Sequence, residues 1–399
     1  MIHASTGAAL SAAARLLPAT ARTLRQSAIR SMTERVLRRG GVNLGQGSCL
    51  LPADPDLLAA AAAAMAAGEN SYTPCEGIPE LRDAVAAKYA RHNGLSIGAE
   101  HVLVTAGASG ALESGLRTFL RPGDEVIVFA PFYPYHVAAV RDLSAVVNSV
   151  ALDGHGWRLL ADRLAAAISP RTRIILFANP GNPTGRVFTR EELETVADVC
   201  RRRDLIAIVD EVYEYLTYDG SCHVSLASLP GMFERTLTLS SAGKTFFVTG
   251  WRVGWMVAPA DVVERVAVHA DRIYVCAPAP LQRAVAAGLG FPDAFFAEQR
   301  AKLDRRRRAL LAALTAAGLD PLRPEGAYYV LARLNPALDD EAAAEELLDR
   351  TGVGSVPGSA FVDGRKATGF SRLCFAVDDT MLDAACRALA APVKAPLAD

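Results

Sequence analysis

Four short apolar runs, each followed by a turn and a helix-like stretch, constrain most strongly what this chain can fold into. They cover residues 101–105, 125–130, 173–177 and 205–209. Continuous apolar runs of this length are typical of strands that are buried on both faces of a parallel sheet. Because strands alternate with helices here, the sequence predicts an α/β fold with a mostly parallel central sheet between helices.

A second, smaller domain is expected from the length and from the C-terminal pattern. A chain of 399 residues is long for a single core. Strand-like runs among helices in the C-terminal part predict an α+β unit there. We expect residues 1–50 to form an N-terminal arm and part of the small domain, residues 51–292 the large cofactor-binding domain, and residues 293–399 the small C-terminal domain.

Composition and charge exclude several classes of function. The formal net charge is −1, which gives no indication of nucleic-acid binding or of attraction to an anionic membrane. The alanine block at 59–67 is too short and too weakly apolar to span a bilayer. A predicted helix at 295–314 carries a run of arginines, which we interpret as a solvated surface.

The cysteines and the N-terminal residues bear on location. None of the seven cysteines forms a C-x-x-C pair or a cluster with histidine, so we expect no metal site, reduced thiols and a cytoplasmic protein. The first thirty-three residues contain four arginines and no acid. We interpret them as an alanine- and arginine-rich helix in preference to an organelle-targeting segment.

Polar groups follow the predicted strands at the points where they end. They are Ser109, Tyr133, Asn182 and Asp210. In open α/β sheets ligands bind at the carboxyl ends of the strands, so four such groups predict one site. The small residues at 107–110 open a helix, whose free N–H groups and dipole favour a phosphate.

The stretch from 236 to 257 indicates the chemistry of that site. Lys244 lies between Ser241 and Arg252, an arrangement that suits a phosphorylated carbonyl cofactor: the amine forms a Schiff base, while hydroxyl and guanidinium hold the phosphate. The alternative is a surface lysine beside a buried arginine. A P-loop is excluded because Thr238 stands where its first glycine is required, and a dinucleotide fingerprint at 352–357 is excluded by Pro357.

The remaining polar residues supply the other roles that this chemistry needs. A carboxylate must keep a pyridine nitrogen protonated, and Asp210 is the candidate. Asn182 and Tyr213 could donate to a phenolic oxygen of the ring. Once the substrate amine displaces it, Lys244 becomes a general base beside the α-carbon. Arg372, which opens a predicted strand, is the candidate for binding a substrate carboxylate in a bidentate manner.

Long segments of this sequence resemble the fold-type I, class I/II aminotransferases that use pyridoxal 5′-phosphate, and within them the kynurenine, glutamine and methionine aminotransferases, a group that includes cysteine-S-conjugate β-lyases. The segments are NLGQG at 43–47, NSYTPCEGIPELRDAV at 70–85, PGDEVIVFAPFYPY at 122–135, NPGNPTGRVFTREELE at 179–194, VDEVYEYLTYDG at 209–220, SLASLPGMFERTLTLSSAGKTFFVTGWRVGW at 225–255, PEGAYYV at 324–330 and GVGSVPGSAF at 352–361.

The resemblance implies a role for each candidate residue. Lys244 would carry the internal aldimine of an aminotransferase that works through pyridoxamine phosphate, moving an amino group between an L-amino acid and a 2-oxo acid. The implied ring-binding residues are Asp210, Asn182, Tyr213 and Tyr133, and the implied phosphate-binding residues are Ala108, Ser109, Ser241 and Arg252. Arg372 would bind the substrate carboxylate, with the backbone of Gly45 nearby. Tyr72 would reach the phosphate of a neighbouring subunit, which implies a homodimer.

Departures from the family pattern leave the substrate and the outcome of the reaction open. Ser48, Cys49, Leu50 and Leu51 follow NLGQG where relatives have Phe-Pro-Asp, and Ala178 stands where they tend to carry asparagine. A specialised amino acid is therefore as plausible a donor as kynurenine. The same carbanion could also undergo β-elimination or oxidation, depending on pocket geometry and water access. A sensor domain of a transcription regulator is disfavoured, because no helix-turn-helix pattern precedes residue 40.

Overall fold

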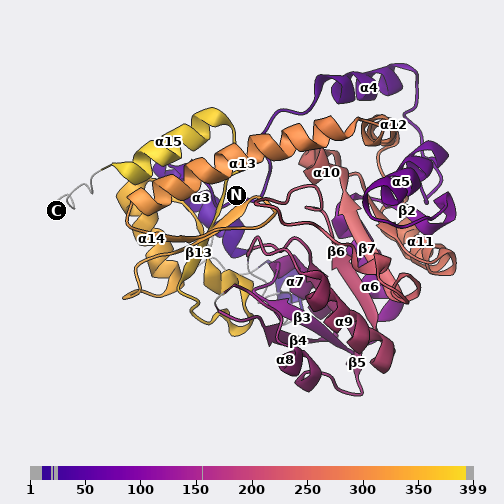
Figure 1. Ribbon diagram of the computed structural model, residues 1–399, viewed down its shortest axis with the longest axis horizontal. Helices are drawn as coiled ribbons and strands as arrows, with labels where there is room; N and C mark the ends of the chain where they lie inside the picture. Colours follow the sequence, from indigo (N-terminus) through magenta and orange to yellow (C-terminus); the bar gives the residue numbers. More distant parts are fainter. Residues whose placement is uncertain (1–10, 19–20, 22–25, 155, 392–399) are drawn as a thin grey trace.

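The computed structural model describes residues 11–18, 21, 26–154 and 156–391. Its centre is a seven-stranded sheet in the order β2-β8-β7-β6-β5-β3-β4, in which every pairing is parallel except those of β8 with β2 and β7. The predicted, mostly parallel sheet is thus confirmed (Figure 1). Its strands are β2 (Val102–Thr105), β3 (Glu125–Ala130), β4 (Val146–Ala151), β5 (Thr172–Ala178), β6 (Ile206–Asp210), β7 (Thr236–Ser241) and β8 (Gly254–Val257).

Helices cover both faces of this sheet because successive strand residues point to opposite sides. In β3, Val126 packs into a cluster with α6, α7 and α11, whereas Ile127 packs into a cluster with α8 and α9. The apolar faces of α4, α5 and α12 form a third cluster against β2 and β8. These helices are α4 (Pro55–Ala66), α5 (Pro79–His92), α6 (Gly107–Phe119), α7 (Pro134–Asp142), α8 (Ala161–Ala166), α9 (Arg190–Arg203), α11 (Ala260–Tyr274) and α12 (Ala279–Leu289).

Two further sheets lie among the remaining helices. One is four-stranded and antiparallel, in the order β12-β13-β10-β9, and the other pairs β1 with β11. The N-terminal segment therefore pairs with the C-terminal part of the chain. The elements are β1 (Val42–Asn43), β9 (Asp320–Leu322), β10 (Tyr329–Arg333), β11 (Val353–Gly354), β12 (Val356–Pro357), β13 (Phe370–Cys374), α3 (Ala28–Arg39), α13 (Asp293–Ala316), α14 (Asp340–Thr351) and α15 (Asp379–Ala390).

Two strands of the large sheet have no clear signal in the sequence. The edge strand β4 mixes exposed and buried positions, so it lacks the apolar run that marks its neighbours. The strand β8 has only four residues and runs antiparallel to both neighbours. Periodicity carries no information about strand direction, and so the sequence predicts the layers better than it predicts the order.

The interpretation of the basic run on α13 as a solvated surface holds for Arg305 and Arg308 but is wrong for Arg307. This helix runs from near α12 to the side of α15 (Figure 1). Arg305 and Arg308 are exposed, but Arg307 is fully buried and its guanidinium donates to both carboxylate oxygens of Asp219 at 2.6 and 2.8 Å. Pairing with a carboxylate offsets the cost of burying this charge, and the sequence alone does not reveal the partner.

The N-terminal prediction is tested only in part. Within this segment the structure describes helix α1 (Ala12–Arg15) and the first turns of α3. Residues 1–10, 19–20 and 22–25 lie outside the described part of the chain. Within the described ranges no helix is both long and apolar enough to cross a membrane. The domain boundaries at 50/51 and 292/293 stay a prediction.

Candidate active site

A cavity of about 620 Å³ opens at the carboxyl ends of the large sheet's parallel strands. The four strand-end groups predicted to converge there all line it. Two residues that were expected at the site do not line it: Gly45 lies behind the cavity wall, and Tyr72 is 80% exposed elsewhere on the surface. The predicted residues that line it are Ala108, Ser109, Tyr133, Asn182, Asp210, Tyr213, Ser241, Lys244, Arg252 and Arg372.

Lys244 enters the cavity from α10 (Ala242–Thr245), a single helical turn that follows β7 directly. The side chain of Ser241 caps this turn by accepting a hydrogen bond from Gly243 N at 3.1 Å. The Lys244 Nζ donates to the Tyr328 hydroxyl at 2.7 Å and to the Gly47 carbonyl at 3.2 Å. Burial lowers the pKa of Lys244, because the charged form is poorly solvated there. The amine is therefore shifted towards its neutral, nucleophilic form.

Asp210 ends β6 and lines the cavity. Its Oδ2 lies 3.0 Å from Nε2 of His136, and its Oδ1 accepts from Val212 N at 3.3 Å. An ionised carboxylate only accepts hydrogen bonds, so His136 carries a proton on Nε2 when it contacts ionised Asp210. His136 packs edge-on against Tyr133, with ring centroids 5.3 Å apart. The two rings and the carboxylate thus hold one another in place.

One end of the cavity is built to receive an anion. Helix α6 begins at Gly107 and presents its first backbone N–H groups there, beside the Ser241 hydroxyl and the Arg252 guanidinium. Gly107 has φ +70°, and a Cβ on it would approach Arg252 Nη2 to 2.5 Å. Arg252 itself is left-handed at φ +55° and donates to Thr249 O at 3.1 Å. The close approach of helix and arginine therefore requires a glycine at 107.

The opposite end holds a buried guanidinium. Arg372 is 0% exposed, donates to Asn182 Oδ1 at 2.9 Å and to Gly45 O at 2.7 Å, and lies 4.2 Å from the centroid of the Tyr329 ring. Its Nε has no partner, and no described carboxylate lies within ion-pair distance of it. A buried cation without a counter-charge is costly, so this arrangement suits a ligand that brings a carboxylate.

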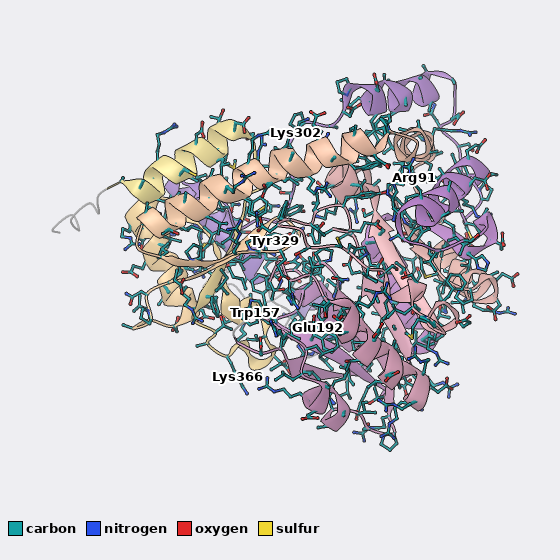
Figure 2. All side chains as sticks on the ribbon, viewed as in Figure 1. Arg91, Trp157, Glu192, Lys302, Tyr329 and Lys366 are labelled. Atoms are coloured by element: carbon teal, nitrogen blue, oxygen red, sulfur yellow. The ribbon has the colours of Figure 1, made fainter. Side chains whose placement is uncertain are left out.

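Four residues of the site have no strong signal in the sequence: Gly47, His136, Tyr328 and Tyr329. The hydroxyls of Tyr329 and Tyr213 are 3.0 Å apart, and Figure 2 places Tyr329 near the centre of the molecule, below α13. A Cβ on Gly47 would collide with the Tyr329 hydroxyl. From the sequence, the two tyrosines where β10 begins are expected in the hydrophobic core. Only the contact with Lys244, which the structure shows for Tyr328, assigns them to the site.

A second polar cluster lies behind the loop that follows Asp210. Ligand atoms of Glu211, Glu214 and His223 lie within 4.8 Å of one another. These groups already have partners within the protein: Lys88 forms an ion pair with Glu214, and His223 Nε2 lies 3.2 Å from Glu211. The cluster is therefore explained by internal charge pairing.

Comparison with known proteins identifies the family to which this chain belongs. The family of class I and II aminotransferases matches residues 39–389. The chain belongs to this family. It is 39% identical to a probable N-succinyldiaminopimelate aminotransferase of Mycobacterium tuberculosis, over 83% of this chain and 85% of that protein. It is 35% identical to kynurenine–oxoglutarate transaminase 3 of Mus musculus, over 86% and 83%.

Solved structures agree with the sequence comparison. The structure of N-succinyldiaminopimelate aminotransferase from Mycobacterium tuberculosis superposes with a TM-score of 0.90 at 37% identity, covering 94% of this chain and 99% of that one. The chain is thus an aminotransferase, an enzyme that transfers amino groups with pyridoxal 5′-phosphate, and the predicted α/β fold of this class is confirmed.

The cavity fits this cofactor on its own chemistry. It offers hydrogen-bond donors and a cation at one end, where only a glycine leaves room beside Arg252. It offers a carboxylate for a basic ring nitrogen and an amine whose pKa burial lowers, so that a carbonyl can react with it.

Proposed function

We propose that Lys244, Asp210 and Arg372 carry the transfer of an amino group between an L-amino acid and a 2-oxo acid. The observation that supports this most directly is their convergence on one cavity from three different elements. The amine can bond a carbonyl, the carboxylate can hold a ring proton, and the guanidinium can hold a substrate carboxylate. The role of Lys244 uses the neutral amine, the form that burial favours.

Other cavity residues would hold the cofactor. Its phosphate would lie at the start of α6, bonded by the backbone of Ala108, by Ser109 and Ser241, and by Arg252. Tyr133 would stack on the ring, while Asn182 and Tyr213 would donate to its phenolic oxygen. Pyridoxal phosphate, when bound, supplies a carbonyl that exchanges with the substrate's amino group and a ring that accepts the electrons of the bond broken at the α-carbon.

The protein's own part in the chemistry is to move and hold protons. Neutral Lys244 can take a proton from the substrate α-carbon at Nζ and return it to a neighbouring carbon. Asp210, held by His136 and by Val212 N, would keep the proton on the pyridine nitrogen of the bound cofactor in place throughout. Neither residue needs to move far, because Asp210 is the last residue of β6 and Lys244 lies on a single helical turn that follows β7 directly.

The substrate class follows from Arg372. Relatives are named for substrates as different as arginine, kynurenine and aspartate or prephenate. The α-carboxylate, which amino acids and 2-oxo acids share, is the group that a buried guanidinium without a counter-charge would recognise in all such substrates. We therefore propose that Arg372 binds the α-carboxylate of both donor and acceptor.

The assembly and its location are part of the same proposal. Tyr72 is 80% exposed, although it belongs to a segment that matches the family, and this supports a homodimer in which Tyr72 reaches the partner's active site. All seven cysteines are free thiols, which supports a cytoplasmic enzyme. We retain a large domain at 51–292 and a small domain formed by 293–399 and part of 1–50.

The test is the absorbance of the purified holoenzyme, recorded while single amino acids are added without any oxo acid. We expect the visible band of the lysine-bound cofactor to bleach as the matching 2-oxo acid appears, which also identifies the donor. A band that survives while ammonia and pyruvate are released would identify a β-lyase instead. Absence of the band in wild type after adding cofactor, with no change in Lys244→Ala, would contradict the proposal.

A further inference from the structure

Tyr328 provides a buried hydroxyl group that contacts Lys244, and no role was expected for this residue. Its side chain is 0% exposed, and its ring lies edge-on to Tyr213 with centroids 5.0 Å apart. Burial raises the pKa of Tyr328 well above its ordinary value, so the phenol keeps its proton at neutral pH.

The directions of three hydrogen bonds determine what this phenol can do. The Tyr328 hydroxyl donates its single proton to the Gly47 carbonyl at 2.8 Å. Its oxygen is therefore left as an acceptor, and Lys244 Nζ donates to it at 2.7 Å. A second N–H of Lys244 is directed at the same Gly47 carbonyl, at 3.2 Å.

A neutral amine has two N–H groups and one lone pair. With both N–H groups of Lys244 held by Tyr328 and Gly47, the lone pair is the only part of the nitrogen left without a partner. The amine lines the cavity, so the lone pair is available there to a reacting proton or carbonyl carbon. The two acceptors thus select the orientation in which Lys244 acts as a base.

Backbone contacts keep these two acceptors in place. Ala327 N donates to Leu216 O at 2.9 Å, which ties the start of β10 to the loop after β6, and Phe375 N donates to Tyr328 O at 3.0 Å. Gly47 approaches so closely that any Cβ on it would meet the Tyr329 hydroxyl. Rigid partners of this kind hold a catalytic group without reorganisation during the reaction.

We propose that Tyr328, together with the Gly47 carbonyl, is a positioning residue that holds the released amine of Lys244 with its lone pair towards the substrate α-carbon. In the proton transfer the lone pair forms the new N–H bond, while the electron pair of the broken C–H bond stays with the cofactor-bound substrate. On the return step the N–H bond of Lys244 breaks, the proton passes to a neighbouring carbon that supplies the electron pair of the new C–H bond, and the nitrogen regains its lone pair. This inference rests on the proposed role of Lys244.

The test compares Tyr328→Phe with wild type and with Tyr218→Phe. Tyr218 is a matched control, because its buried hydroxyl also donates to a single carbonyl, that of Ala327 at 2.8 Å, but it has no contact with Lys244. Each holoenzyme is mixed in a single turnover with an amino acid that wild type accepts, carrying hydrogen or deuterium at the α-carbon. The loss of the cofactor's visible band gives the rate.

We expect Tyr328→Phe to react about 10-fold more slowly, since a misplaced base lowers the rate of proton transfer. Its deuterium isotope effect should rise, while its affinity for cofactor and its KM stay within about 2-fold of wild type. Tyr218→Phe should match wild type in both rate and isotope effect. An unchanged rate and isotope effect in Tyr328→Phe, or an equal change in Tyr218→Phe, would overturn the proposal.

A second variant separates positioning from a direct role. In a Lys244→Ala background there is no amine to orient, so adding Tyr328→Phe should leave the residual rate within about 2-fold. A further 10-fold loss in the double variant would show that Tyr328 acts independently of Lys244 and would overturn the inference. If instead the wild type fails to release an oxo acid at all, the proposed function itself is wrong, which is a different outcome.

Discussion

Two pairs of cations, one structural and one in the active site, differ in what compensates their positive charge. Lys88 and Arg307 each have a carboxylate beside them, Glu214 in one case and Asp219 in the other. Arg372 is equally buried and Lys244 is partly buried, yet their partners are hydroxyl, amide and carbonyl oxygens. Charges that the fold has compensated stabilise it, whereas charges left uncompensated are available to ligands.

Removing Lys244 should give the largest functional effect. We expect Lys244→Ala to lower the rate of amino transfer about 10⁴-fold or more, because one residue is both the carbonyl-bonding group and the base. Its free energy of unfolding should not fall, since no carboxylate loses a partner. Stopped-flow absorbance and urea denaturation measure the two quantities. A variant that remains active but unfolds easily would place Lys244 with the structural cations.

Arg372 should follow, with a loss of about 10²- to 10³-fold in kcat/KM for Arg372→Met, because the substrate carboxylate then enters a site without a counter-charge. The matched control is Arg307→Met, another fully buried arginine. It should retain kcat/KM for each folded molecule but lose stability, since Asp219 and Asp304 lose a shared partner. If both variants lose activity to the same extent, the distinction between the two arginines fails.

How much of this site the sequence predicts depends on what determines each residue's position. Asn182 and Asp210 could be predicted because the carboxyl ends of parallel strands meet at one edge. Lys244 could be predicted because its neighbours, Ser241 and Arg252, carry a recognisable chemical pattern. The large sheet's layers follow from the same apolar runs.

The site residues that could not be predicted are those whose role depends on a partner far away in the sequence. His136 contacts Asp210 from the first turn of α7, and Tyr328 contacts Lys244 from the turn before β10, so neither has a local pattern. Aromatic residues in an apolar run are expected to pack in the core, and the sequence does not show which tyrosine hydroxyl among them has a functional role. Arg307 illustrates the reverse, since a basic run indicates a surface until Asp219 is seen beside it.

Lys88 offers a direct test on the structural side. We expect Lys88→Met to lower the free energy of unfolding by about 3 kcal/mol, because it leaves Glu214 buried and charged with only Asn93 and Ser240 as donors. Adding Glu214→Gln should restore most of the loss by removing the charge. Denaturant titration measures both variants. A double variant no more stable than Lys88→Met would mean that packing, and not the charge, dominates at this position.

The smallest expected effect is a pH dependence at Asp219. The guanidinium groups of Arg307 and Arg323 hold the pKa of Asp219 well below its usual value of about 3.9. Because the folded pKa lies below the unfolded one, this carboxylate stabilises the fold above about pH 4, and its contribution is lost as the pH falls towards the folded pKa. Asp219→Asn should therefore unfold more easily than wild type at pH 7, while the two proteins converge at acid pH. Parallel urea titrations at pH 7 and pH 3 measure this difference. An equal gap between the proteins at both pH values would show that the hydrogen-bond geometry, and not the ionised state of Asp219, anchors Arg307, and so would weaken the comparison from the structural side.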